Sequence, residues 1–307
     1  MIKNKKVVVT GGLGFIGSHL VEELHTNNQV FIVDNESTGK HQNIVNFDLD
    51  NISLTLDSIT SVDLHEIMEG ADYVFHQAAL PSVPRSVKDP LSSNETNVTG
   101  TLKVLIAARD CGVKKVVFAS SSSVYGDTPV LPKVETMPLN PQSPYATTKA
   151  TGELYCQNFT DIYGLPTVAL RYFNVFGPRQ DPESQYAAVI PKFITAIIKG
   201  ESPVIYGDGQ QSRDFTYVKN VVQANILACE TKMQGVYNVA CGRKTTLNEM
   251  VGIMGELLDK DVNPKYTDPR VGDVKHSLAD IDKIKAHGYQ PSEDFKEDLK
   301  KVVEFFL

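Results

Sequence analysis

The sequence predicts an α/β protein with a doubly wound parallel β-sheet, in which helices cover both faces of the sheet. The first observation is an apolar, β-branched run that leads into a glycine-rich turn and then into a helical pattern. The second is another apolar run that ends in a single acidic residue, Asp34. The third is that strand-like and helix-like segments keep alternating through the first half of the chain. The strand-like runs cover residues 5–10, 29–33, 71–76 and 113–119. Together these features are typical of a Rossmann-type sheet.

The glycine-rich turn contains Gly11, Gly14 and Gly17. Gly11 allows a tight turn, Gly14 allows the backbone to approach a phosphate, and Gly17 allows the helix to pack on the strand. Asp34 follows the second strand, where its carboxylate can accept hydrogen bonds from a ribose. The same carboxylate would repel a 2′-phosphate. The sequence therefore predicts a dinucleotide site that prefers NAD to NADP.

The third strand is expected at residues 54–57, within a polar and irregular segment. Asp57 and Ser58 would then lie at its carboxyl end, near the adenine. After a helical pattern at residues 62–68, the next strand runs into a Gln-Ala-Ala segment at residues 77–79. Small side chains at this place suit a close approach of the backbone to a ligand.

A rigid loop is expected at residues 81–90 because this segment is rich in proline. A helix should follow from about residue 94 to residue 111, with Gly112 as its C-terminal stop. The next strand, residues 113–119, delivers four serines, Ser120 to Ser123, at its carboxyl end. Open parallel sheets bind ligands at the carboxyl ends of their strands, so these hydroxyls are well placed for a substrate.

Tyr145 is predicted to be an acid/base residue at the start of a helix. Ser143 is a suitable N-cap, and Pro144 suits the first helical position. A free phenol has a pKa of about 10, so a base near neutrality needs strong stabilisation of its phenolate. Lys149 lies one turn further along the same helical face, and an opposite charge that close typically lowers such a pKa. We therefore expect Lys149 to lower the pKa of Tyr145.

The composition of the 307 residues, 41% hydrophobic and 22% charged, is that of an ordinary globular protein. A net charge of −7 disfavours nonspecific binding of nucleic acid. The four cysteines are scattered without metal-ligand spacing, so we expect no disulfide framework and no metal site. The apolar runs are too short for a membrane span or a signal peptide. We therefore expect a cytoplasmic protein that is not associated with a membrane.

The second half of the chain alternates less regularly and is expected to leave the sheet and return to it. Helices are predicted at residues 189–198, 217–229, 247–258 and 295–306, and strands at residues 203–206 and 236–240. We expect an NAD-binding domain, residues 1–171 plus 212–242, and a smaller α/β substrate-binding domain, residues 172–211 plus 243–307. The ligand cleft should lie between them.

At this point the sequence resembles the extended short-chain dehydrogenase/reductases and, within them, the nucleotide-sugar 4-epimerases. The resemblance covers nearly the whole chain, and it includes the glycine turn and the pair of Tyr145 and Lys149. The other matching segments are residues 34–35, 76–79, 97–100, 120–126, 171–178, 207–209, 213–218 and 270–273. It implies a homodimer with a four-helix interface formed by the helices at residues 94–111 and 145–163. It also implies that residues 236–240 join the sheet of the NAD-binding domain.

The resemblance implies a role for each matching residue. Ser121 would hold the 4-oxygen of the sugar beside Tyr145, and Lys149 would also bind the nicotinamide ribose. The residues expected to bind NAD are Gly11, Gly14, Phe15, Ile16, Gly17, Asp34, Asn35, Ser37, Thr38, Gly39, Asp57, Ser58, Gln77, Ala78, Ala79, Asn97, Ser120, Tyr145, Lys149 and Tyr172. Those expected to bind the UDP-sugar are Ser82, Ser121, Ser122, Tyr145, Asn174, Val189, Tyr206, Arg213, Arg270, Asp273 and Ser277. Arg213 and Arg270 match arginines that bind the diphosphate.

The residues after Ser121 discriminate among the reactions known in this family. A 4,6-dehydratase usually carries an Asp-Glu pair where Ser122 and Ser123 stand, and a nucleotide-glucuronate decarboxylase usually has Glu at the second of these positions. Without these acids, the resemblance implies oxidation and re-reduction at carbon 4 of the sugar. Tyr145 would take the proton of the 4-hydroxyl while NAD accepts the hydride, and the 4-keto sugar would turn and take the hydride back on its other face.

The expected substrates are UDP-GlcNAc and UDP-GalNAc, together with UDP-Glc and UDP-Gal. In the family, a small residue at the position of Ser277 admits N-acetylated sugars, whereas a bulky aromatic residue tends to exclude them. The loop at residues 81–86 also resembles that of the N-acetylhexosamine subgroup. One alternative is a UDP-glucuronate 4-epimerase, in which Arg85 would bind the carboxylate of the sugar. Another is a noncatalytic NAD-sensing protein, although such proteins generally lose the tyrosine or the lysine.

Overall fold

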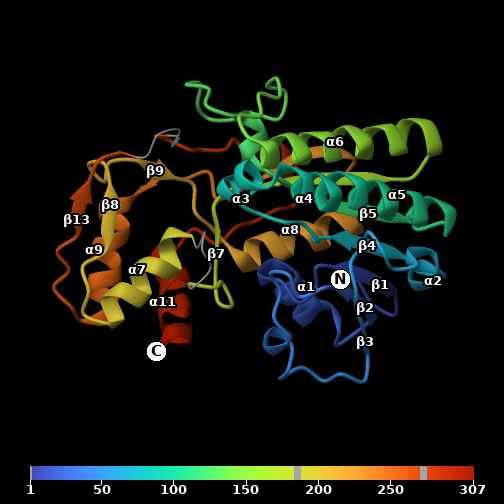
Figure 1. Ribbon diagram of the computed structural model, residues 1–307, viewed down its shortest axis with the longest axis horizontal. Coiled ribbons are helices and arrows are strands. Elements are labelled where there is room, and N and C mark those ends of the chain that lie inside the picture. The colour runs from blue at the N-terminus through green and yellow to red at the C-terminus, as the bar shows by residue number, and fades with distance from the viewer. Residues whose placement is uncertain (1, 183–187, 270–274) are drawn as a thin grey trace.

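The computed structural model describes residues 2–182, 188–269 and 275–307, and its main feature is a seven-stranded sheet (Figure 1). The strand order is β11-β6-β5-β4-β1-β2-β3, and every neighbouring pair is parallel. The strands are β1 Lys6–Thr10, β2 Gln29–Asp34, β3 Ile52–Leu56, β4 Tyr73–His76, β5 Lys115–Ser121, β6 Thr167–Tyr172 and β11 Gly235–Val239. The chain order reverses between β1 and β4, and a ligand is expected at this switch point. The predicted doubly wound α/β fold is thereby confirmed, including the return of residues 235–239 to the sheet.

Helices cover both faces of this sheet, and the reason is visible along β1. Val7 and Val9 belong to one hydrophobic core and Val8 belongs to the other, because successive side chains of a strand point to opposite faces. The first core is closed by α1 Phe15–Leu24 and α8 Val218–Glu230. The second core is closed by α2 Leu64–Met68, α5 Gly100–Asp110 and α6 Pro144–Tyr163. Figure 1 shows α5 and α6 on one side of the sheet and α1 and α8 on the other.

A smaller group of elements lies beside the sheet and has a core of its own (Figure 1). Its helices are α7 Val189–Ile198, α9 Leu247–Leu258 and α11 Phe295–Phe306, whose bounds are those predicted from the sequence. Its strands are β8 Val204–Tyr206 and β13 Lys265–Thr267, which pair in parallel. Short strands connect this group to the sheet: β7 Val175–Phe176, β9 Ser212–Arg213, β10 Thr216–Tyr217 and β12 Thr245–Thr246. These pairs of residues are too short to be detected by sequence periodicity.

The expected rigid loop at residues 81–90 is wrong, because most of this segment is helical. Helix α3 Val83–Lys88 is capped by Ser82, whose hydroxyl accepts a hydrogen bond from the backbone of Arg85, and α4 Pro90–Asn94 is capped by Asp89. Each proline lies in the first turn of its helix, where no backbone donor is needed. The following helix therefore begins earlier than predicted and passes through a π-helical turn, Glu95–Thr99, before α5.

Three short helical segments complete the described fold: 3₁₀ turns at His41–Asn43 and Ser122–Tyr125, and α10 at Asp282–Lys285. Gly112, with a φ of 66°, ends α5 in the left-handed conformation predicted for it. Within the described ranges, no helix combines the length and apolar character that crossing a membrane demands.

Two helical glycines provide a matched stability test of how closely α6 packs on the sheet. A Cβ at Gly152 of α6 would lie 2.4 Å from the buried ring of Phe118 on β5, whereas a Cβ at Gly252 of α9 would meet no atom within 4 Å. Gly152→Ala should lower the free energy of unfolding by about 1–3 kcal/mol because the ring must move. Gly252→Ala should raise it by about 0.5–1 kcal/mol through helix propensity. Urea denaturation checks both values, and a stabilised Gly152→Ala protein would contradict the close packing.

Candidate active site

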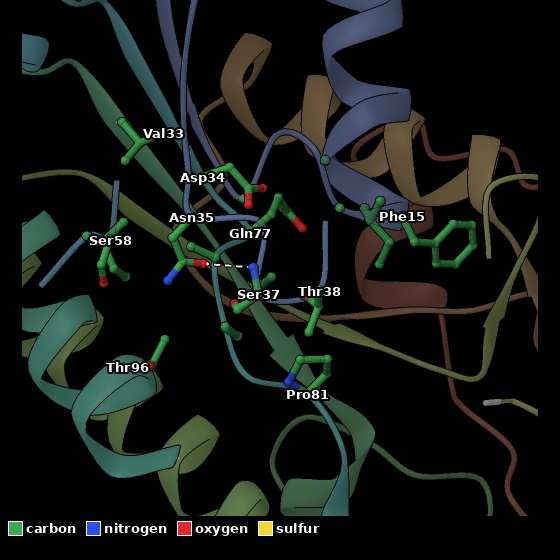
Figure 2. A pocket seen from close by; sticks show the side chains of 18 of the residues that line it. Phe15, Val33, Asp34, Asn35, Ser37, Thr38, Ser58, Gln77, Pro81 and Thr96 are labelled. Carbon is green, nitrogen blue, oxygen red and sulfur yellow. Dashed lines mark hydrogen bonds between the residues drawn. The ribbon is translucent and has the colours of Figure 1, made fainter. Parts of the chain in front are cut away.

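The candidate site begins with a cavity of about 950 Å³ at the carboxyl ends of the central strands. Figure 2 shows side chains from several strand ends around this space, among them Asp34 at the end of β2, Asn35 after it, Ser58 after β3 and Gln77 after β4. The lining includes most of the residues expected to bind NAD: Gly11, Gly14, Phe15, Ile16, Gly17, Asp34, Asn35, Ser37, Thr38, Asp57, Ser58, Gln77, Ala78, Ala79, Ser120, Tyr145, Lys149 and Tyr172. The structure therefore brings together residues that are far apart in the sequence.

The glycine turn lies at one end of the cavity and has no room for side chains. Gly11 has a φ of 73°, and a Cβ on it would lie 2.6 Å from the backbone nitrogen of Ala78. A Cβ on Gly17 would lie 2.0 Å from the carbonyl oxygen of Gly11. Gly14 is the N-cap of α1, whose first turn contains no acidic residue. Free backbone donors and the positive end of the helix dipole therefore face the cavity, which fits the pyrophosphate of a dinucleotide.

Asp34 has its carboxylate fixed by two backbone donors. Oδ2 accepts a hydrogen bond from the nitrogen of Leu13 at 3.0 Å, and Oδ1 accepts one from the nitrogen of Glu36 at 2.8 Å. Burial raises the pKa of Asp34, and these two hydrogen bonds oppose that rise. Asn35 accepts a hydrogen bond from the backbone of Ser37, drawn in Figure 2, and so shapes the adjacent turn. This acidic strand end fits a ribose with a free 2′-hydroxyl.

Two residues expected to bind NAD, Gly39 and Asn97, do not line the cavity. A Cβ on Gly39 would lie 3.0 Å from Oδ2 of Asp34, so this glycine allows the loop to pack on the carboxylate. Asn97 is 2% exposed, and its amide group bonds the nitrogen and the carbonyl oxygen of Leu80 as well as the hydroxyl of Thr148. Gly39 thus packs on Asp34, which lines the cavity, whereas Asn97 fixes Leu80, which stands in the chain between the lining residues Ala79 and Pro81.

The end of β4 is held in position by buried hydrogen bonds that the sequence did not predict. The hydroxyl of Thr10 is bonded to Nδ1 of His76 at 2.7 Å and accepts a hydrogen bond from the nitrogen of Ala78. Burial lowers the pKa of His76 to about 3, so this imidazole is neutral. Gln77, Tyr172 and Asn225 form a second group, in which the amide of Asn225 contacts both cavity-lining side chains. Asn225 comes from α8, more than fifty residues from Tyr172, and no local pattern points to it.

The start of α6 matches the sequence prediction. Ser143 is the N-cap, and its hydroxyl accepts a hydrogen bond from the nitrogen of Ala146 at 3.1 Å. The nitrogen of Tyr145 is also satisfied, since it donates to the hydroxyl of Ser86 in α3 at 3.0 Å. The side chain of Tyr145 is hydrogen-bonded to Ser121 at the end of β5. The predicted pair of tyrosine and serine is therefore formed at the rim of the cavity.

The expectation that Lys149 lowers the pKa of Tyr145 is not met by this geometry. Desolvation raises the pKa of Tyr145, and the hydrogen bond with Ser121 opposes that rise. The ammonium of Lys149 donates to the carbonyl oxygen of Ala119 at 2.7 Å and lies 5.9 Å from the centre of the Tyr145 ring. Burial lowers the pKa of Lys149 to about 8. Helical spacing predicted that the two side chains are neighbours, but it could not predict that the ammonium bonds a strand carbonyl.

A second cavity, of about 1460 Å³, lies in the smaller group of elements. Asn174, Val189, Tyr206 and Arg213, all expected to bind the substrate, are among its lining residues. Gln180, Lys192 and Gln211 also line it, although no motif in the sequence indicates them. Ser82, Ser121, Ser122 and Ser277 line neither this cavity nor the first. Arg270 and Asp273 lie outside the described residues.

Several backbone contacts fix the walls of the second cavity. A guanidinium nitrogen of Arg213 donates to the carbonyl oxygens of Ser212 and Lys275 at 3.0 and 3.1 Å. The nitrogen of Ser277 donates to the carbonyl oxygen of Ser212 at 3.0 Å, so Ser277 lies beside the strand that carries Arg213. Asn174 has a φ of 34°, and its amide donates to the carbonyl oxygen of Asp214. Arg213 and Asn174 are thereby held on adjoining parts of one wall.

Asp214, the residue after Arg213, is fully buried. It joins its own segment to two others. Its carboxylate accepts hydrogen bonds from the nitrogens of Cys241, Gly242 and Ala279 at 2.9, 3.1 and 3.2 Å. Burial nevertheless raises the pKa of Asp214 to about 6. Within the described part of the chain, no three His, Cys, Asp or Glu side chains are grouped as a metal ion would require.

Comparison with known proteins assigns this geometry to a family. Residues 7–240 match the model of the NAD dependent epimerase/dehydratase family. The chain is 52% identical to a UDP-N-acetylglucosamine 4-epimerase from Methanobrevibacter ruminantium M1 in complex with UDP-N-acetylmuramic acid, with a TM-score of 0.98 and 99% of each chain covered. It is 40% identical to a UDP-glucose 4-epimerase with UDP-glucose from Thermotoga maritima, with a TM-score of 0.93 and 98% coverage of each. It is 36% identical to a UDP-glucose 4-epimerase from Thermus thermophilus in complex with NAD, with a TM-score of 0.88 and 98% coverage of each.

The raised pKa of Asp214 predicts how the stability of the fold depends on pH. Because the folded state holds this proton more tightly than the unfolded state, Asp214 stabilises the fold below pH about 4, and that contribution is lost as pH rises through about 6. The loss amounts to roughly 3 kcal/mol, at 1.36 kcal/mol for each pKa unit. Asp214→Asn cannot titrate. The unfolding free energy of the unsubstituted protein minus that of the variant should therefore fall by about this amount between pH 4 and 7.

Denaturant unfolding at several pH values measures this difference. The matched control is Asp208→Asn, an exposed aspartate in the same region whose carboxylate accepts a hydrogen bond from the backbone of Gln210. The control should keep the pH dependence of the unsubstituted protein. A constant difference between the unsubstituted protein and Asp214→Asn from pH 4 to 7 would contradict the role of the buried carboxyl.

Proposed function

The chain belongs to the NAD dependent epimerase/dehydratase family, and on this premise we propose that it is an NAD-dependent 4-epimerase of UDP-sugars. Its proposed substrates are UDP-GlcNAc and UDP-GalNAc, together with UDP-Glc and UDP-Gal. The observation that carries the proposal is the hydrogen-bonded pair of Tyr145 and Ser121 at the rim of the dinucleotide cavity. The similarity to the 4-epimerase from Methanobrevibacter ruminantium M1 supports the N-acetylated pair.

The residues of the first cavity fit NAD by the chemistry of their groups. The glycine turn offers backbone donors to a pyrophosphate, and Asp34 offers acceptors to a ribose. Lys149 on α6 and Tyr172 at the end of β6 line the same cavity as Tyr145. When it is bound, NAD supplies a ring that accepts and returns a hydride. Because that exchange leaves no net redox change, the same NAD should serve successive turnovers.

In the proposed mechanism, Tyr145 takes the proton of the 4-hydroxyl of the sugar and later gives it back. Ser121 holds the 4-oxygen beside the phenol, since its hydroxyl contacts Tyr145 and its backbone is fixed at the end of β5. Lys149, anchored on the carbonyl oxygen of Ala119, keeps a positive charge under the reacting groups. The 4-keto sugar turns between the two proton transfers. Ser122 and Ser123 supply no carboxylate, so elimination of water has no acid/base partner at these positions.

The second cavity is proposed to hold the nucleotide part of the substrate. Arg213 lines it together with Asn174, Val189 and Tyr206, and a guanidinium suits a diphosphate. Lys192 adds another cation to this lining. The negative net charge of the protein makes such local cations necessary for an anionic ligand. Arg270 and Asp273 keep the roles predicted for them from the sequence.

A UDP-glucuronate 4-epimerase is the alternative activity, and it depends on a cation for the carboxylate of the sugar. Arg85, the predicted cation, lies on α3 but lines neither cavity. UDP-GlcA therefore belongs in the substrate assay as a competing candidate. A homodimer formed through the helices near residues 94–111 and 145–163, and a location in the cytoplasm, stay predictions from the sequence.

Tyr145→Phe should lower the rate of epimerisation by at least about 100-fold, because it removes the proton acceptor. The variant should still retain NAD, since the phenyl ring fills the same space. The assay offers UDP-GlcNAc, UDP-Glc and UDP-GlcA separately without added NAD, and released nucleotide is measured after denaturation. Tyr163→Phe, at the exposed end of the same helix, is the matched control and should leave the rate unchanged. Near-normal epimerisation by Tyr145→Phe would refute the assignment.

Ser277→Tyr should lower activity on UDP-GlcNAc and UDP-GalNAc more than activity on UDP-Glc and UDP-Gal. Ser277 lies beside the strand of Arg213, and the family resemblance implies that a large ring at this position occupies space that the N-acetyl group needs. The ratio of kcat/KM for the two pairs of sugars measures the effect, and Ser277→Ala is the control that keeps a small side chain. Equal losses on both pairs would show that Ser277 does not select the sugar.

A further inference from the structure

Helix α6 is attached to the end of β5 by three side chains spaced one helical turn apart. Tyr145 is hydrogen-bonded to Ser121, the ammonium of Lys149 donates to the carbonyl oxygen of Ala119, and the carboxylate of Glu153 accepts a hydrogen bond from the hydroxyl of Ser120. The three strand partners are consecutive residues. The first two links involve the groups of the proposed proton transfer, whereas the third involves Glu153, which takes no part in that transfer.

Glu153 is a buried carboxylate with a complete set of partners. Its side chain is 4% exposed, and Arg171 on β6 binds it with both guanidinium arms, Nε to Oε1 at 2.8 Å and Nη2 to Oε2 at 2.6 Å. The guanidinium of Arg171 also lies 4.6 Å from the centre of the Tyr125 ring. Tyr172, the residue after Arg171, lines the dinucleotide cavity. Glu153 thus connects α6 to two neighbouring strands at the place where both reach the site.

The surroundings of Lys149 contain few groups that can stabilise its positive charge. From β5 it meets the carbonyl oxygen of Ala119 and the ring of Phe118, whose centre is 5.0 Å from the ammonium. From β4 it faces His76, and from its own helix it faces Tyr145 and Cys156. Burial lowers the pKa of His76 to about 3 and raises that of Cys156 to about 12, so both are neutral near pH 7. Glu153, one turn from Lys149, is the anion in this set.

We propose that Glu153 is a positioning residue of the active site: its carboxylate, oriented by Arg171, keeps Lys149 charged and holds Ser120 against α6. The proposal deepens the proposed function and rests on it for the catalytic consequence, but the charge on Lys149 can be measured independently. Burial lowers the pKa of Lys149 to about 8, close to neutrality, and two groups on the same helix, Cys156 and the carboxylate of Glu153, oppose this fall. Without the carboxylate, a substantial fraction of Lys149 would be neutral at physiological pH.

Glu153→Gln tests the proposal because it removes the charge and keeps the shape of the side chain. The titration midpoint of Lys149 should fall by about one pH unit or more. It is measured from the ¹³Cε resonance of labelled lysine in the protein as it is isolated, and Lys149→Met identifies the resonance by its loss. In the epimerase assay, a fall of one unit should lower kcat about sixfold more at pH 8.5 than at pH 6.5, because a lower midpoint moves the alkaline limit of activity toward neutrality.

Glu135→Gln is the matched control. Glu135 is also a partner of Arg171, whose guanidinium donates a hydrogen bond to the backbone carbonyl oxygen of Glu135. The carboxylate of Glu135 accepts a hydrogen bond from the nitrogen of Asn238. It is not among the groups that influence Lys149. Glu135→Gln should therefore leave the midpoint of Lys149 unchanged. Glu153→Asp, which retains the charge, should keep the midpoint closer to that of the unsubstituted protein than Glu153→Gln does.

If Glu153→Gln does not fold, Glu153→Gln combined with Arg171→Met replaces it, because the double variant leaves no unpaired buried charge. The midpoint of Lys149 should still fall in that protein. An unchanged midpoint in a folded variant without the carboxylate would overturn the proposal, as would equal falls in Glu153→Gln and Glu135→Gln. Absence of epimerase activity in the unsubstituted protein would refute the proposed function, while the titration of Lys149 would still decide the role of Glu153.

Discussion

The site depends on one contact above all, the packing of α6 against the carboxyl end of β5. Gly152 makes the contact close, since no Cβ fits between the helix and Phe118. The polar links of Tyr145, Lys149 and Glu153 then fix the helix along the strand. A shift of α6 by a fraction of a turn would separate all three pairs at once. The proposed acid/base group, the buried ammonium and the serine hydroxyls are therefore positioned as one unit and not as independent side chains.

In the proposed function, the two cavities divide recognition of ligands between the sheet and the smaller group of elements. The glycine turn and Asp34 belong to the sheet, whereas Asn174 and Arg213 belong to segments that leave it. Asp214 joins these segments through three backbone donors, directly after Arg213. Its raised pKa reflects how completely this joint is buried. Asp214 thus links Arg213, which is proposed to bind the diphosphate, to the segment that follows β11.

Much of the fold could be predicted from the sequence because its signals are local. Helices α7, α9 and α11 have long apolar periodicity, and the glycine turn has a steric requirement that identifies it. The helix α3 was missed because prolines that mark a loop also suit the first turn of a helix. The site beyond its motifs could not be predicted. Ser86, Asn225 and Glu153 act through tertiary contacts, and no spacing in the chain indicates which carbonyl the ammonium of Lys149 will bind.

The electrostatics of Tyr145 limits how the site can work. Desolvation raises the pKa of the phenol, which is the opposite of what a base requires, and a single hydrogen bond from Ser121 opposes that rise. The ammonium of Lys149 is bonded to a carbonyl oxygen and not to the phenol. The described residues therefore hold the pKa of Tyr145 above its usual value, and the proposed proton transfer requires positive charge closer to the phenol than the ammonium of Lys149 lies in this structure. In the proposed function, ligand binding would supply that charge, so proton transfer would be restricted to the loaded complex.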